Sequence, residues 1–485
     1  MKKRAQLPNA QTYTILFRGF AASRHPKLAA SEAFRIYQNM LNSDRLKPNT
    51  IHMNSVLEVC SRAGDIDLLF TVVNTANQVL RAPDNRTYTI ILNALRHQVE
   101  PFAQRRGLED VQHQKNVETS IQRAKSIWQE VVRRWRKDQI VIDEPLVCAM
   151  GRILLQGDHN DRNSVLALLE QTMNLPAFRE ANTDLMAGWF SQEAGSTGAA
   201  AEGKTVAAVP ETQKSSRTRA SNHAVPTQNT LSLVMSTLRS IKRTTLAPRY
   251  WDYLTTTYHI RADTENFTRY LKALQLGNAS TKTAELVPTI PQNVMAPKFF
   301  RISLQTCIND NLNQHAFKNA CRIFDTMTQT MRYPDAESMR LFLHGARANY
   351  RQFQQQRGVD PVGSKMALGK QIVAALDRMW EPFRILSTSF SYPTQRTQSP
   401  EGEWNASIND RWEVVAVARR MMAAIDTVVL ENMADPPVLK VLKTRNTIIR
   451  QYVSRFNEKN NQMNKKIQEK SAEQEQPESD ASASS

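Results

Sequence analysis

The stretch that decides the fold is residues 48–57, PNTIHMNSVL, in which a proline and an asparagine precede a run of recurring apolar residues. The same arrangement opens residues 83–92, PDNRTYTIIL, 35 positions further along, and residues 8–17, PNAQTYTILF. Proline cannot continue a helix, and asparagine or aspartate caps the next one. Each stretch therefore predicts that one helix ends and another begins. Recurrence at this period indicates a repeat architecture.

A second pattern recurs between these turns. It is an alanine, an aliphatic residue three positions on, an aromatic residue four on, and methionine or valine seven on. This spacing places four side chains on one helix face, and the small alanine lets a neighbouring helix approach. Core packing explains each stripe by itself, but recurrence behind the same turn indicates a repeated hairpin. The three copies are Ala33/Ile36/Tyr37/Met40, Ala124/Ile127/Trp128/Val131 and Ala320/Ile323/Phe324/Met327.

The turn and the stripe together resemble the pentatricopeptide repeat (PPR) family, whose helix-turn-helix units have this period and end in Pro-Asp or Pro-Asn. The resemblance implies an all-α fold, an α-solenoid or superhelix of stacked hairpins with long insertions. One hairpin cannot bury its apolar face alone, so neighbouring hairpins share a continuous core. The long inserts and basic body are similar to fungal mitochondrial PPR proteins of RNA processing or small-ribosomal-subunit maturation.

The organisation that follows is two arrays separated by a linker. We expect an N-terminal array over residues 8–190, with repeats at about 10–49, 50–84, 85–143 and 144–178. Residues 191–223 are rich in Ser, Thr, Ala and Gly, which predicts a disordered linker. The remaining predictions are a degenerate array over 224–386, capping helices over 405–460 and a disordered acidic tail over 464–485.

The net charge of +17 over 485 residues indicates a polyanionic partner, most simply nucleic acid. The four cysteines, Cys60, Cys148, Cys307 and Cys321, form no C-x-x-C pair, which argues against zinc and disulfides. No apolar run is long enough for a membrane span. No amphipathic presequence follows the basic start, so either targeting is absent or this start lies inside a longer reading frame.

Two positions in each repeat are candidate RNA contacts. In the family, base choice depends on a polar residue early in the first helix and on the last residue of the repeat. Short polar side chains there can hydrogen-bond a base edge, although Asn or Asp after proline is also an ordinary helix cap. The predicted pairs are Thr14 with Asn49, Asn54 with Asp84, Thr89 with Asp143, Ser232 with Asp263, and Ser303 with Asp335.

The resemblance implies a base preference for each pair. Thr with Asn favours adenine, Asn with Asp favours uracil, and Thr or Ser with Asp favours guanine. Lys and Arg along the same groove would hold phosphates, and that part of the affinity should fall with salt. Two repeats depart from the pattern, the fourth with Cys148 and the sixth with Thr268 and Lys298.

No sequence feature indicates catalysis, a cofactor, a metal or a small-molecule substrate. A P-loop, a G-x-G-x-x-G run, the H-x-E and P-C-x-x-C marks of deaminases and an Asp-rich nuclease cluster are all missing from the sequence. The leading hypothesis is non-enzymatic binding of single-stranded mitochondrial rRNA or mRNA. The alternatives are a structural subunit or assembly scaffold that contacts mitoribosomal small-subunit proteins, and a tetratricopeptide-type peptide scaffold, which the 35-residue period disfavours.

Overall fold

The computed structural model describes residues 8–99, 109–178, 223–348, 350, 353–354, 358, 360–389 and 408–474. Every regular element in these residues is a helix, which confirms the predicted all-α fold. The chain divides into two compact units, Met1–Arg269 and Tyr270–Ser485. None of the described helices combines the length and apolar composition needed to cross a bilayer.

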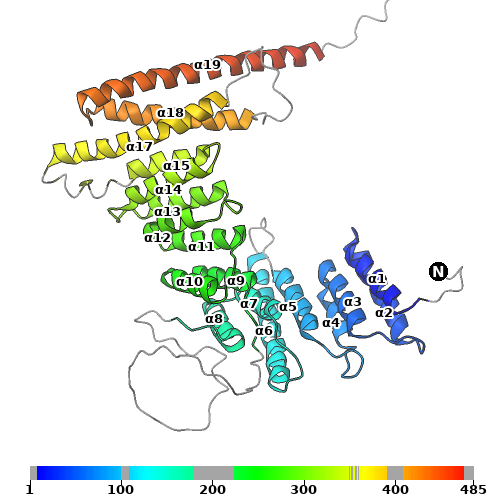
Figure 1. Ribbon diagram of the computed structural model, residues 1–485. Helices are drawn as coiled ribbons and strands as arrows, with labels where there is room; N and C mark the ends of the chain where they lie inside the picture. The colour runs from blue at the N-terminus through cyan, green and yellow to red at the C-terminus, as the bar shows by residue number, and fades with distance from the viewer. Residues whose placement is uncertain are drawn as a thin grey trace, which may run out of the picture. The chain divides into compact units, whose positions relative to one another are not determined.

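Unit 1 is a stack of helical hairpins in chain order (Figure 1). The first helix of each hairpin packs on the first helix of the next, and the second helices of the first four hairpins each contact the first helix of their own hairpin and that of the next. We call the first helices the A row and the second helices the B row. The hairpins are α1 (Ala10–Ala21) with α2 (Pro26–Leu41), α3 (Thr50–Ala63) with α4 (Ile66–Val73), α5 (Asn85–Val99) with α6 (Glu109–Arg136), α7 (Glu144–Leu154) with α8 (His159–Met173), and α9 (Gln228–Ser240) with α10 (Ala247–Thr257), before α11 (Thr264–Leu276) begins.

The predicted turns start the A helices because their Asn or Asp side chains are N-caps. Asn49 accepts a hydrogen bond of 3.0 Å from the His52 N–H, and Asp84 accepts one of 2.8 Å from the Thr87 N–H. Such a bond satisfies a backbone donor that a helix terminus otherwise leaves without a partner. Equivalent bonds come from Asn9 to α1, from Asp143 to α7 and from Asp263 to α11.

The predicted stripes lie in the core of the hairpins. In α2, Ala33 and Tyr37 are fully buried, and the Tyr37 hydroxyl lies 2.8 Å from Thr75 Oγ1 beyond α4. The stripe of α6 buries Trp128 in the same way. In unit 2, Phe324 of α14 is fully buried and stacks on Phe342 with ring centroids 4.2 Å apart.

One buried carboxylate joins the A row across the predicted linker. Glu144, the first residue of α7, is 8% exposed and accepts hydrogen bonds from the backbone N–H groups of Thr227 and Thr230, at 3.1 and 2.9 Å. It also accepts both threonine hydroxyl groups, at 2.5 and 2.8 Å. Thr227 is the N-cap of α9 and makes no capping bond of its own, so Glu144 caps this helix instead. Of the predicted linker 191–223, only His223 lies within the described residues.

Unit 2 repeats the hairpin stacking (Figure 1). Its helices are α12 (Ser280–Leu286), α13 (Pro297–Asn309) with α14 (Ala316–Thr330), α15 (Ala336–Ala348) with α17 (Pro361–Ser389), and α18 (Ile408–Leu430) with α19 (Pro436–Gln474). The first helices again contact one another, α13 with α15 and α15 with α18. The predicted capping helices therefore form a further hairpin of the stack. The disordered tail expected from residue 464 is wrong in its start, because α19 is helical through Gln474.

Candidate nucleic-acid interface

The N-terminal ends of the A helices lie side by side in unit 1. His52 Nε2 of α3 is 2.9 Å from the Ala10 carbonyl of α1. Asn85 Nδ2 of α5 donates to Asp143 Oδ2 at the start of α7, at 2.6 Å. With the Glu144 bonds from α7 to α9, these contacts align the first turns of α1, α3, α5, α7 and α9 along one edge. The predicted pairs of this unit all belong to that edge.

The second hairpin brings its predicted pair into direct contact. Asn54 Nδ2 donates to Asp84 Oδ1 at 3.0 Å. Asn54 Oδ1 accepts from the Thr87 hydroxyl group at 2.7 Å. Asn54 is 4% exposed and Asp84 is half-buried. Among the bonds of the described residues, one Asn54 N–H and Asp84 Oδ2 have no partner.

The other predicted residues of unit 1 make local bonds. The Thr14 hydroxyl group donates to the Ala10 carbonyl at 3.1 Å, while Asn49 caps α3. Thr89 likewise donates to the Asn85 carbonyl, at 2.8 Å. Asp143 takes its side-chain bond from Asn85 and not from Thr89.

The fifth hairpin shows a similar separation. Ser232 is half-buried on α9, and Asp263 is exposed and caps α11. Of the four pairs predicted in unit 1, the structure therefore joins only Asn54 and Asp84 by a direct hydrogen bond.

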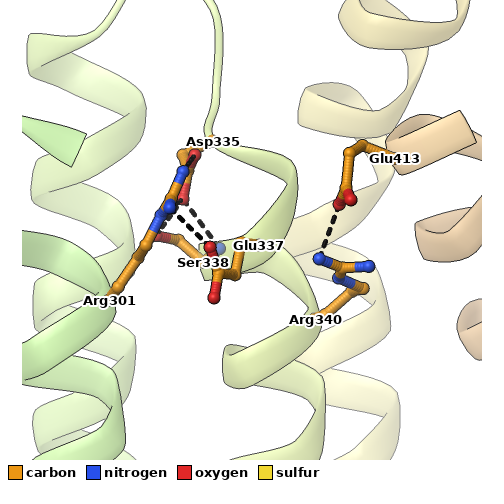
Figure 2. A network of polar contacts seen from close by, with 6 residues as sticks. All are labelled: Arg301, Asp335, Glu337, Ser338, Arg340 and Glu413. Carbon is orange, nitrogen blue, oxygen red and sulfur yellow. Dashed lines mark hydrogen bonds and ion pairs between the residues drawn. The ribbon is translucent and has the colours of Figure 1, made fainter. Parts of the chain in front are cut away.

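The pair predicted for the seventh repeat is not presented as expected. Ser303 is fully buried, and its hydroxyl group has no hydrogen-bond partner in the described part of the chain. Arg301 takes its place, donating to both oxygens of Asp335 at 2.8 and 2.6 Å (Figure 2). Arg301 also contacts Glu337 at 2.5 Å. The Ser338 N–H and hydroxyl groups also donate to Asp335 Oδ2, so Oδ2 accepts three hydrogen bonds and Oδ1 accepts one, from Arg301.

This ion pair perturbs both of its partners. Burial raises the pKa of Asp335, but hydrogen bonds from Arg301 and Ser338 outweigh it, so the net pKa lies below the ordinary value. The hydrogen bond to Asp335 raises the pKa of Arg301. The next junction has a related pair, Arg340 with Glu413 at 2.5 Å, on α15 and α18 (Figure 2).

The sequence contains the signal that places Arg301 correctly. Asn54 lies five residues after its N-cap Asn49, and Arg301 lies five residues after the N-cap Ala296. Pro297 is the first residue of α13, a position that tolerates proline because its N–H would lack a helical partner anyway. The predicted repeat ends at Pro297 and Lys298, two residues later than the structure places the boundary. The predicted RNA-contacting position therefore falls on Ser303 and not on Arg301.

A second group of candidate contacts was not named from the sequence. Each A helix of unit 1 carries an arginine in its last turn, and four of the five B helices carry no basic residue there. Basic residues stabilise the C-terminal end of any helix dipole, so the dipole alone does not explain this difference. We call these five residues the arginine edge, which consists of Arg18, Arg62, Arg96, Arg152 and Arg239.

The arginine edge is partly engaged within the protein. Arg62 donates to the Ala21 carbonyl at the end of α1. Arg152 donates to Asn229 of α9 at 3.0 Å. Arg18 and Arg239 are exposed. The row of A helices thus has polar pairs along one edge and positive charge along the other.

The described residues contain no group of three or more His, Cys, Asp or Glu side chains placed to hold a metal ion. All four cysteines are buried and free. Burial raises the pKa of Cys60, Cys148 and Cys307 to about 12, and that of Cys321 to about 11. These thiols stay neutral at physiological pH and are poor nucleophiles. That the protein is not an enzyme remains a prediction from its sequence.

Comparisons with known proteins bear on this region. A sequence profile described as the pentacotripeptide-repeat region of PRORP matches residues 3–104. No curated protein matches the chain. Among solved structures, the chain is similar to the pentatricopeptide repeat protein PPR10 in complex with an 18-nt psaJ RNA element. The two share 13% identity with a TM-score of 0.39, over 92% of this chain and 59% of that one.

PPR10 from maize is also similar, at 12% identity and a TM-score of 0.26, over 95% of this chain and 65% of that one. The chain therefore spans less than two thirds of either structure. By the profile match, residues 3–104 are a pentatricopeptide-type repeat region.

Proposed function

We propose that the A row of unit 1 binds single-stranded RNA, with bases toward its polar edge and phosphates toward the arginine edge. The observation that carries the proposal is the Asn54–Asp84 pair, which belongs to the repeat region and leaves one amide N–H and one carboxylate oxygen without a partner. Uracil has a carbonyl acceptor beside an N–H donor, so it complements such a pair. The proposal concerns binding and no catalytic step.

The spacing of the two edges supports this placement. Asn54 and Arg62 are eight positions apart on α3. At the helical rise of 1.5 Å per residue, this separates them by about 12 Å along the axis. Arg62 is exposed, and besides the N–H that it donates to Ala21 it has further guanidinium N–H groups for the phosphate of a nucleotide whose base lies at Asn54. Exposed Arg18 and Arg239 offer the same contact at the two ends of the row.

Binding of the full chain to single-stranded RNA pools, followed by selection and sequencing, tests this function. We expect enrichment of sequences with a preferred base at the position bound by the second hairpin. The double variant Asn54→Ser with Asp84→Asn should change that base and leave the others. Equal loss of affinity for every sequence would reject base recognition, and no preference for RNA over an uncharged polymer would reject RNA binding.

The process and compartment belong to the same proposal and rest on the resemblance of the repeats. They are mitochondrial RNA metabolism, with rRNA or mRNA as target, in processing, stability or small-subunit maturation. Crosslinking in the isolated organelle and sequencing of the bound RNA test both. Recovery of the protein outside mitochondria would reject this part and leave RNA binding standing.

A second candidate function is an assembly scaffold or structural subunit of the mitochondrial ribosome. Unit 2 favours it, because the position of Asn54 is occupied there by Arg301 and Arg340, which form ion pairs with Asp335 and Glu413. Such a surface suits protein contacts better than base recognition. Steep salt dependence of RNA binding without base preference would select this function over the first.

A further inference from the structure

We infer that Thr87, in the hairpin that follows, fixes the orientation of the Asn54 side-chain amide and so determines which base the second hairpin accepts. The inference rests on the proposed RNA-binding function. Thr87 is fully buried, so it acts as a positioning residue and does not contact RNA itself. It lies at the third position of α5, whereas Asn54 belongs to α3.

The chemistry of the three side chains permits one arrangement. The Asp84 carboxylate only accepts, so the Asn54 atom that faces it at 3.0 Å is the amide nitrogen. The amide oxygen then faces the Thr87 hydroxyl group at 2.7 Å, which supplies a donor. If the Asn54 amide were rotated by half a turn, its oxygen would face Asp84 Oδ1. Both atoms are acceptors and no proton would lie between them, so this orientation is unfavourable. Asp84 thus excludes the rotated amide. The Thr87 hydroxyl group, whose single proton can go to Asn54 Oδ1 or to Asp84 Oδ1, further stabilises the observed orientation when it donates to Asn54.

Thr87 is itself held from three directions. Its backbone N–H donates to Asp84 Oδ1 at 2.8 Å, and its hydroxyl oxygen accepts from the Asp84 N–H at 3.1 Å. The hydroxyl group also lies 2.8 Å from Asp84 Oδ1. A capping arrangement of this kind fixes the hydroxyl position without any contribution from ligand. The base-contacting pair of one hairpin is therefore preorganised by the next hairpin.

The same position in other hairpins does not repeat this contact. The third residue of α3 is His52, whose ring bonds Asn49 and Ala10. In α7 the third residue is Leu146, which has no side-chain donor. In unit 2, Ser338 donates to Asp335, where Arg301 replaces the asparagine. The hydroxyl bond from Thr87 to the asparagine of the preceding A helix is thus not repeated at the equivalent positions of α3, α7 and α15.

Thr87→Val removes the hydroxyl group and keeps the shape of the side chain. We expect the ratio of affinities for RNAs that differ at one nucleotide to fall by about tenfold, since one well-placed hydrogen-bonding pair accounts for that much base discrimination. Thr87→Ser should restore the ratio. Thr12→Val is the matched control, because the Thr12 hydroxyl group makes the equivalent capping bonds with the Asn9 N–H and side chain at the start of α1. It should leave the ratio unchanged.

A second measurement needs no RNA. Selective nitrogen-15 labelling of asparagine in the full chain reports the Asn54 side-chain amide by NMR. We expect its hydrogen exchange to accelerate in Thr87→Val and to return to the wild-type rate in Thr87→Ser. If Thr87→Val does not fold, Thr87→Cys replaces it, because a thiol is a weak donor of similar size.

The outcomes separate the inference from the function on which it rests. Absence of RNA binding by the wild-type chain rejects the proposed function, and the amide measurement still tests the positioning role. Unchanged base discrimination in a folded Thr87→Val that binds RNA overturns the inference alone. Unchanged exchange of the Asn54 amide in that variant overturns it as well.

Discussion

Arg301 and Asp335 form a two-point ion pair across the α13–α15 junction, with hydrogen bonds of 2.8 and 2.6 Å (Figure 2). The pair occupies the positions that Asn54 and Asp84 occupy in unit 1. Two parallel bonds between charged groups hold more tightly than one amide bond. The junction in unit 2 is therefore fixed by charge where the junction in unit 1 keeps groups available for a ligand.

Arg301→Gln should destabilise unit 2 at neutral pH by about 1–2 kcal/mol, a range reduced because the arginine is 41% exposed. The Asp335 pKa is lowered in the folded state. The stability that the ionised Asp335 carboxylate contributes is therefore fully present above its unfolded-state pKa of about 3.9. This stability is lost as the pH falls through the lower pKa that Asp335 has in the folded state. The difference between wild type and variant should shrink below about pH 4.

Hydrogen exchange of the α13 and α15 amides at several pH values measures this effect. Arg340→Gln is the control, since Arg340 makes a single contact with the more exposed Glu413 and should cost under about 1 kcal/mol. Equal protection losses at pH 7 and pH 3 would contradict the assignment of the effect to the Asp335 carboxylate.

The arginine edge predicts a defined salt dependence. Replacing Arg18 and Arg239 with Gln should weaken RNA binding equally for all sequences. It should also reduce the slope of log affinity against log salt by about 0.7 for each arginine. Lys27 and Arg249 are exposed residues of the B helices α2 and α10, in the same two hairpins.

The variant with Lys27→Gln and Arg249→Gln changes the net charge by the same amount on the other row. We expect its slope to match that of the wild type, as measured by fluorescence anisotropy across a salt series. If both double variants lose affinity alike, RNA binding depends on net charge and not on the arginine edge.

Glu144 predicts a local stability effect at α9. Glu144→Gln replaces an acceptor oxygen with an NH2 group opposite the N–H and hydroxyl donors of Thr227 and Thr230. Buried donors without acceptors cost about 1–3 kcal/mol, which should appear as faster hydrogen exchange in the first turns of α9. Glu32→Gln is the control, because it alters an exposed pair with Arg35 on α2 and should leave hydrogen exchange close to that of the wild type. Wild-type exchange in Glu144→Gln would show that another group caps α9.

The sequence predicted the helical hairpins because the residues that end one helix and begin the next are adjacent in the sequence. Proline followed by Asn49 or Asp84 both ends one helix and caps the next, so a few residues decide the boundary. Pro297 shows the limit of this signal, because proline is equally suited to the first position of a helix. The start of the acidic tail was wrong because residues 464–474 lack an apolar stripe, yet they continue a helix whose earlier turns pack on α18.

The candidate interface was predictable in its positions and not in its contacts. The resemblance to the PPR family predicted Asn54 and Asp84 as a pair, and the structure joins them. Spacing does not reveal that Thr87, a residue of the next hairpin, bonds Asn54, because that contact depends on how two helices pack. The arginine edge was missed for a related reason. A last-turn arginine is common, and only the assignment of helices to the A row separates these five from others.

The place of Arg301 has a practical consequence for any search for a target transcript. Repeats counted along the chain would allot a guanine to the α13 hairpin, since Ser303 and Asp335 stand at the counted positions. Because Arg301 and not a short polar side chain faces Asp335, we expect that hairpin to specify no guanine, and the RNA site of the proposed function to be shorter than the number of hairpins suggests. A transcriptome query should be built from unit 1 alone and left unconstrained beyond it.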